Sequence, residues 1–306
     1  MPVVPLVGRA AIRVRGGDKD DYARVVEQFR RRNPDAIIGT YVSGGGCRPR
    51  AQFDSYPPET IAYDRLPKSA YTGEVIDGAH TVNVADERTA DQFADLIIQE
   101  AIDRRMAFLY LDEIRHPSSG GTKIPWEAMT RYLRRIRTGL NAHGMKLVAN
   151  VAVSPWIMAG RDADLLAEAV DGMCFEGPFE PQWCRPNAER VAAEIDVYRK
   201  WLAAGKLILL APTGEREHSR EDEYRLIAAM AVLIREPGQS LFVHQDYFRS
   251  EPDWGRWPAQ YGAPRGKLDR SGPLLWRREF ESGRLMIDPA KGQAGPYEEQ
   301  PRHAPP

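Results

Sequence analysis

Short apolar runs alternate with stretches of helical periodicity along most of the chain. Eight runs predict β-strands, at 9–14, 36–42, 80–84, 108–112, 146–151, 173–176, 206–211 and 240–244. Residues with a helical period lie between most of them, at 19–32, about 86–104, 126–143, 162–169, 187–204 and 219–235. Strands that alternate with helices are parallel, because each helix returns the chain to the same edge of the sheet. The pattern therefore predicts an α/β fold, specifically a (β/α)8 TIM barrel.

Two regions interrupt the alternation. From Gly44 to about Ala79 the chain is rich in Pro, Gly, Tyr and Asp without a clear period, which predicts a functional loop or a substrate-binding insertion. Beyond about residue 247, residues 275–287 predict a short C-terminal β-hairpin that turns at Ser282-Gly283. Residues 290–306 have the composition of a disordered tail. We expect one barrel domain over 1–289, with the extension beginning near 247.

The composition of the chain argues against some classes of binding partner. The 306 residues carry 42 basic and 43 acidic side chains, so no net field favours nucleic acid or an anionic membrane. No apolar run approaches the ~18 residues that span a bilayer. The first residues lack the features of an intact signal peptide. The protein is thus expected to be extracellular or periplasmic if a signal was removed, and cytoplasmic otherwise; the oligomeric state is left open.

Cysteine and histidine spacing argues against metal and cofactor sites. Cys47, Cys174 and Cys184 share no C-x-x-C spacing, which disfavours a zinc cluster and a disulfide framework, although one bridge stays open. Cys174 is predicted to be a core residue. Glycine motifs that bind nucleotide phosphates are also missing from the sequence, and we expect no cofactor. His116 and His143 are predicted to be solvated, as is the basic face of the helix containing Arg131–Arg137.

Two of the predicted strands end in carboxylates. The run Phe108–Leu111 is followed by Asp112-Glu113, and the run 173–175 by Glu176. In parallel sheets and barrels the carboxyl ends of strands are where catalytic groups converge. Two convergent carboxylates are the minimum for acid/base cleavage of a glycosidic bond. The alternative is that these acids cap helices or pair with arginines.

The pair can be given roles. Asp112 and Glu176 end strands that are predicted to lie two strand spacings apart in the barrel. Because their side chains reach inward, we expect the two carboxyl groups to be roughly 5–9 Å apart, a range that covers both retaining and inverting geometries. Glu176 has apolar neighbours and suits the general acid, which leaves Asp112 as the nucleophile or base. The reverse assignment stays open, and Glu113 is a rival for Asp112.

Polar and aromatic residues at the other strand ends predict a sugar-binding mouth. Amides and carboxylates bind hydroxyl groups, and aromatic rings cover the apolar faces of sugars. The predicted substrate-binding residues are Tyr41, Asn83, Tyr110, Asn150, Trp156, Trp183, His244, Asp246 and Trp254.

Three segments resemble a known group of enzymes. The strand 108–113, the segment 171–176 and the C-terminal part from Tyr261 resemble bacterial TIM-barrel glycoside hydrolases related to the endo-α-1,4-polygalactosaminidase family. The motif R-x-F-x-x-G-x-V-x-x-N-P of that family reads here from Arg278 to Pro289, with Leu285 for Val and Asp288 for Asn. The resemblance implies a TIM barrel with Asp112 and Glu176 as its catalytic pair.

Three hypotheses follow. The leading one is a glycoside hydrolase that cleaves a polysaccharide by a two-carboxylate mechanism. The second is a non-catalytic carbohydrate-binding barrel with the same mouth. The third is a metal-dependent lyase or aldolase that uses Glu113, Glu176 and His244 around an ion.

Overall fold

The computed structural model describes part of the chain in two units. The described residues are 27, 31, 39–43, 47–49, 71–76, 79–103, 107–117, 123–151, 158, 160–178, 188–211, 220–243, 263–270, 276–281, 283–288, 293–294 and 298–299. One unit comprises Met1–Val153 and Gly160–Cys174, and the other Ser154–Ala159 and Phe175–Pro306.

A parallel sheet forms the core of the first unit. Its strands are β1 (Gly39–Ser43), β5 (Phe108–Ile114), β6 (Lys146–Val151) and the first residues of β7 (Gly172–Glu176), in the order β1-β5-β6-β7. All three pairings are parallel, and Gly39 lies opposite Phe108. A Cβ atom at Gly39 would lie 2.3 Å from the Phe108 ring, so the close approach of β1 to β5 requires glycine.

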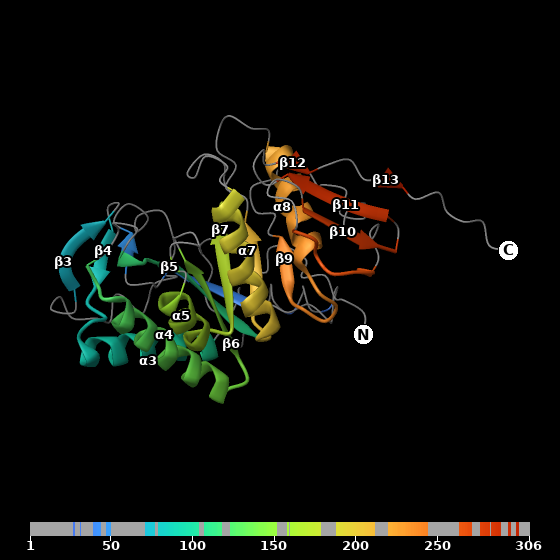
Figure 1. Ribbon diagram of the computed structural model, residues 1–306. Coiled ribbons are helices and arrows are strands. Elements are labelled where there is room, and N and C mark those ends of the chain that lie inside the picture. The colour runs from blue at the N-terminus through green and yellow to red at the C-terminus, as the bar shows by residue number, and fades with distance from the viewer. Residues whose placement is uncertain are drawn as a thin grey trace. The chain divides into compact units, whose positions relative to one another are not determined.

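Three helices of the first unit pack side by side in the order α3, α4, α5 (Figure 1). They are α3 (Glu87–Asp103), α4 (Trp126–Ala142) and α5 (Arg161–Ala169), and all three were predicted to within one or two residues. Asp86 caps α3: the Thr89 backbone N–H donates to its carboxylate at 2.8 Å. This hydrogen bond holds the pKa of Asp86 below its ordinary value of 3.8.

The polar face of α4 is exposed, as predicted, and also ion-paired. The side chains of Arg131, Arg134 and Arg135 are each nearly half exposed. Arg135 donates to Asp95 of α3 at 2.5 Å, and Arg137 donates to Asp171 at 2.9 Å. The face therefore neutralises acids on neighbouring segments of this unit.

A small antiparallel sheet is formed by residues that come between β1 and α3 in the sequence. It corrects the prediction that residues 80–84 belong to the parallel sheet. Its strands are β2 (Cys47–Pro49), β3 (Tyr71–Ile76) and β4 (Ala79–Val82), in the order β2-β4-β3. The strand expected at 80–84 exists, but its membership of the parallel sheet was wrong, since β1 pairs directly with β5. The described residues of the interval 44–79, for which no strand was predicted, include β2 and β3. Asp77-Gly78, between Ile76 and its partner Ala79, is a strong two-residue hairpin signal.

The second unit continues the parallel βα pattern. It contains the end of β7, then α7 (Ala188–Ala203), β8 (Leu207–Ala211), α8 (Arg220–Ile234) and β9 (Leu241–Val243). The strand order is β7-β8-β9, and β8 and β9 are parallel, with Ile208 opposite Leu241. All of these elements agree with the predicted ones to within one or two residues.

A C-terminal hairpin completes the second unit. β10 (Trp276–Phe280) and β11 (Gly283–Asp288) are antiparallel, with Phe280 opposite Gly283. The hairpin is confirmed, but Gly283, which was predicted to lie in the turn, is the first residue of β11. Within the tail expected to be disordered, β12 (Gln293–Ala294) and β13 (Glu298–Glu299) pair with β11.

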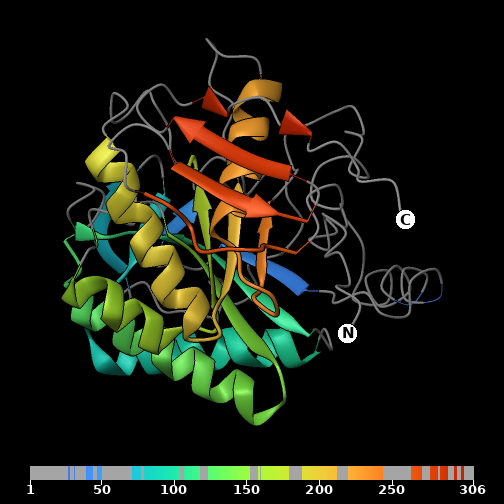
Figure 2. The ribbon, with the colours of Figure 1, turned by 45° about the vertical axis from the view of Figure 1, so that its right-hand side comes forward.

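Arg278, in the family-like motif, fastens this hairpin to the end of α8. The side chain is only 3% exposed. Its guanidinium donates to the carbonyl oxygens of Leu233 and Arg235 at 3.0 and 2.9 Å and to the Glu236 carboxylate at 2.6 Å. It also lies over the ring of Phe280, 5.8 Å from the centroid. Figure 2 shows β10 and β11 (red) crossing α8 (orange). The first two fixed positions of the motif thus have a structural role.

The described architecture is α/β with parallel βα units and a C-terminal hairpin. The predicted strand at 9–14 lies outside the described residues, and of the predicted helix 19–32 only Glu27 and Arg31 are described; both are helical and ion-paired at 2.6 Å. Among the helices that the structure describes, none is long and apolar enough to cross a membrane.

Candidate active site

The carboxyl end of β5 contains a bulge at the candidate carboxylates. Leu111 pairs with Ala149 of β6, and the next pairing joins Ile114 to Val151. Two residues of β5, Asp112 and Glu113, therefore stand opposite a single residue of β6, which is Asn150. Bulges are rare between parallel strands and are common next to active sites, where they redirect a side chain.

Asn150 and Asp112 are brought together at this bulge. The Asn150 side chain amide donates to Asp112 Oδ1 at 2.7 Å, which is the short distance typical of a bond to a charged acceptor. Asn150 is 4% exposed, whereas Asp112 is partly exposed. One side of the Asp112 carboxyl group is thus held by protein, and part of the residue reaches solvent.

The carboxyl end of β7, in the second unit, presents Glu176. Glu176 is exposed, and the backbone turns directly after it at Gly177, whose φ of +61° favours glycine. The preceding residue, Phe175, stacks on Trp201 of α7 with ring centroids 5.6 Å apart. Because successive side chains of a strand alternate, Glu176 points to the side of β7 away from α7.

Buried polar contacts support this packing. Phe175 also contacts the ring of Tyr198, at 5.2 Å between centroids, and the Tyr198 hydroxyl donates to Glu194 at 2.5 Å. Tyr198 is fully buried and Glu194 is 4% exposed. Cys174, two residues before Glu176, is buried, as predicted.

The other predicted site residues are placed as follows. Tyr41 of β1 pairs in register with Tyr110 of β5, and Tyr110 is partly exposed, two residues before Asp112. Asn83 follows β4 and is partly exposed. Glu113 lies in β5. Five candidates lie outside the described residues: Trp156, Trp183, His244, Asp246 and Trp254.

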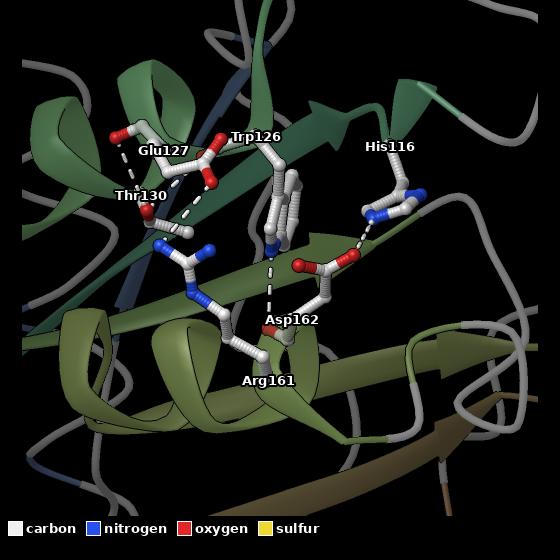
Figure 3. A network of polar contacts seen from close by, with 6 residues as sticks. All are labelled: His116, Trp126, Glu127, Thr130, Arg161 and Asp162. Carbon is white, nitrogen blue, oxygen red and sulfur yellow. Dashed lines mark hydrogen bonds and ion pairs between the residues drawn. The ribbon is translucent and has the colours of Figure 1, made fainter.

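A polar cluster near the end of β5 was not predicted from the sequence. His116 was predicted to be solvated; it is 6% exposed, so this prediction was wrong. Its Nε2 lies 3.0 Å from Asp162 Oδ2, and its ring meets the Trp126 ring edge to face at 4.7 Å between centroids (Figure 3). His116 and Asp162 are separated by 46 residues, so no local pattern indicates their contact.

The same cluster ties three segments of the first unit together. The Trp126 indole N–H donates to the backbone carbonyl of Asp162 at 3.0 Å, and Arg161 pairs with Glu127 at 3.4 Å (Figure 3). The segment after β5, the start of α4 and the start of α5 are therefore held by one network. The predicted solvation of His143, at the end of α4, agrees with its exposure.

Among the residues that the structure describes, no three His, Cys, Asp or Glu side chains are grouped so as to hold a metal ion. His244 and Asp246, which belong to the metal-enzyme hypothesis, lie outside these residues.

Solved structures that are similar in fold to this chain include two α-amylases. An α-amylase from Malbranchea cinnamomea superposes with a TM-score of 0.52 at 10% identity, over 90% of this chain and 67% of that one. A noncanonic maltogenic α-amylase from Thermotoga neapolitana gives a TM-score of 0.50 at 7% identity, over 89% and 69%. The Aspergillus fumigatus Ega3 complex with galactosamine gives 0.46 at 13% identity, over 74% and 80%.

These similarities are similarities of fold, at low sequence identity. The two α-amylase matches show a likeness of fold alone, which agrees with the predicted α/β class. No protein-family model matches the sequence, and no curated protein matches it.

Proposed function

We propose that the protein is a glycoside hydrolase that cleaves a polysaccharide with Asp112 and Glu176 in a complete (β/α)8 barrel. The observation that carries this proposal is the placement of both acids at the carboxyl ends of parallel strands, with Asp112 at a bulge. Strand ends of this kind hold the catalytic groups of TIM-barrel enzymes. The structural relatives are glycoside hydrolases, which supports the same reaction class.

Strand register supports the choice of these two acids. Cys174 of β7 pairs with Asn150 of β6, and paired residues of neighbouring strands face the same side of a sheet. Glu176, two residues after Cys174, takes the same side of β7. Asn150 also holds Asp112, so within the first unit Asp112 and Cys174 are both tied to this residue of β6.

The proposed roles follow from the local chemistry. Asp112, which accepts a hydrogen bond from an amide, acts as the charged nucleophile or base. Glu176 protonates the glycosidic oxygen as the sugar leaves, and returns as the base for water if the mechanism is retaining. Tyr110, two residues before Asp112, is proposed to contact the sugar. The polygalactosaminidase resemblance favours an amino-sugar polymer as the substrate.

The experiment is hydrolysis of a panel of amino-sugar and neutral polysaccharides, with and without EDTA. The parent is compared with Asp112→Asn, Glu176→Gln and the control Glu113→Gln. We expect cleavage that survives EDTA, disappears in the first two variants and persists in the control. Binding without cleavage in all four proteins would indicate a carbohydrate-binding barrel, and cleavage lost to EDTA would indicate a metal enzyme.

A further inference from the structure

Asn150 occupies a position that the bulge of β5 creates. In a regular parallel ladder one residue of β6 would face one residue of β5, but here Asn150 faces both Asp112 and Glu113. A bulge redirects the side chains of the longer strand, so the orientation of Asp112 is not fixed by strand geometry alone. It depends on the contact that Asp112 makes with the neighbouring strand.

That contact is short and comes from a buried donor. The Asn150 amide donates to Asp112 Oδ1 at 2.7 Å, and Asn150 is 4% exposed. Its neighbours on β6, Ala149 and Val151, are buried as well, so the amide is carried by a packed strand. A donor on such a strand fixes the carboxylate without the entropic cost of a mobile partner.

Burial argues against a direct role for Asn150 in sugar binding. A side chain that touches substrate must present an atom to the mouth, whereas Asn150 is nearly covered and uses its amide nitrogen on Asp112. The sequence pattern had placed Asn150 among the substrate-binding residues, together with Tyr110.

We propose that Asn150 is a positioning residue that orients the Asp112 carboxylate for the reaction, and that it does not bind the sugar. This inference rests on the proposed function. It predicts that Asn150 affects the rate constant of the chemical step and leaves the affinity for the glycan unchanged.

The hydrogen bond between Asn150 and Asp112 is tested by thermal stability, which does not depend on activity, in variants that exchange the amide and the carboxylate. Asn150→Asp has nearly the shape of the parent but places a second carboxylate against Asp112. We expect its melting temperature at pH 7 to fall by at least about 3 °C, and this deficit to shrink in acid as one carboxyl is protonated. The exchange Asp112→Asn with Asn150→Asp restores an amide–carboxylate contact and should recover most of the loss.

The positioning role is tested with Asn150→Ala and Asn150→Ser, which also serve if Asn150→Asp does not fold. On the best polysaccharide of the panel we expect kcat to fall roughly 100-fold with KM within about threefold of the parent. Calorimetric titration with an oligosaccharide of that polymer is then made in the Glu176→Gln background. The affinity should be the same with and without Asn150→Ala.

Three results would overturn the inference. A rise in KM, or a loss of affinity in the Glu176→Gln background, would make Asn150 a substrate-binding residue. If the Asn150→Asp variant were as stable as the parent at every pH, Asn150 and Asp112 would not be joined by a hydrogen bond in the parent. A parent that cleaves no polysaccharide would overturn the proposed function instead; if the exchange still restored stability, Asn150 and Asp112 would then form a structural contact only.

Discussion

The two strand ends that carry the candidate carboxylates are built differently. At the end of β5 a bulge and a buried amide hold Asp112 by a hydrogen bond. At the end of β7 the strand is held by its other face, where Phe175 stacks against the aromatic rings of α7, and Glu176 is exposed. The first arrangement fixes the Asp112 carboxyl group itself, and the second fixes the backbone beside the exposed Glu176. This difference matches what a fixed nucleophile or base and a proton donor each require.

The largest expected effect is the fall in kcat when either candidate carboxylate is replaced, and its dependence on the leaving group of the substrate separates their proposed roles. On polysaccharide, both Asp112→Asn and Glu176→Gln should lower kcat at least about 10³-fold. On an aryl glycoside with a good leaving group, departure needs little protonation, so Glu176→Gln should recover about 100-fold relative to its own rate on polysaccharide, and Asp112→Asn should not. Recovery in Asp112→Asn alone would reverse the two roles.

The aromatic support of β7 gives the largest expected change in stability. Phe175→Ala removes a fully buried ring and should lower the free energy of unfolding by about 3–5 kcal/mol. Urea unfolding measures this, with Phe175→Leu as a control that keeps most of the volume and should cost clearly less. A loss below about 1 kcal/mol for the alanine variant would contradict the packing role of Phe175.

The polar support near β5 should contribute less. His116→Gln lowers the free energy of unfolding by about 1–2 kcal/mol, because it removes a part-buried contact with Asp162. A double-mutant cycle with Asp162→Asn should give a coupling energy of about 1 kcal/mol. Coupling near zero would mean that the two side chains act separately.

The smallest effect is expected at Asp86, an exposed carboxylate with a purely structural role. Its pKa lies below 3.8 in the folded protein because it accepts the Thr89 N–H, so its stabilisation is present above the unfolded pKa. This stabilisation is lost as the pH falls through the folded pKa. Melting curves of the parent and Asp86→Ala should therefore differ at neutral pH and converge in acid, once the pH is below the lowered pKa of Asp86. A difference that is independent of pH would exclude the cap.

The sequence predicted elements well where a single periodicity dominated. α4 and β6 were located nearly to the residue, since the buried face of α4 repeats with a helical period and β6 is an unbroken apolar run. The cap of α3 is Asp86, one of the residues whose type and position before the helix suit a cap. The strands of the interval before α3 were missed because Asp77-Gly78, which indicates a hairpin, was not weighed against the surrounding loop composition.

What the sequence did not reveal depends on pairings between distant residues. Asp112 and Asn150 were both selected as strand-end residues, but their contact depends on a one-residue shift in register that neither strand encodes alone. The contact of His116 with Asp162 is of the same kind. Burial of His116 could not be inferred from its neighbours Arg115 and Pro117, which are typical of a loop.

Arg278 has a consequence for the order of events during synthesis. Its guanidinium is the partner of the Leu233 and Arg235 carbonyl oxygens at the end of α8, yet it leaves the ribosome more than forty residues later. Until then these two carbonyl oxygens must accept hydrogen bonds from water instead. The hairpin that carries Arg278 has not yet formed at that stage. The second unit therefore cannot reach its final state until residues 276–288 have left the ribosome, and nascent chains stalled before Trp276 should be far more sensitive to protease than chains that contain the hairpin.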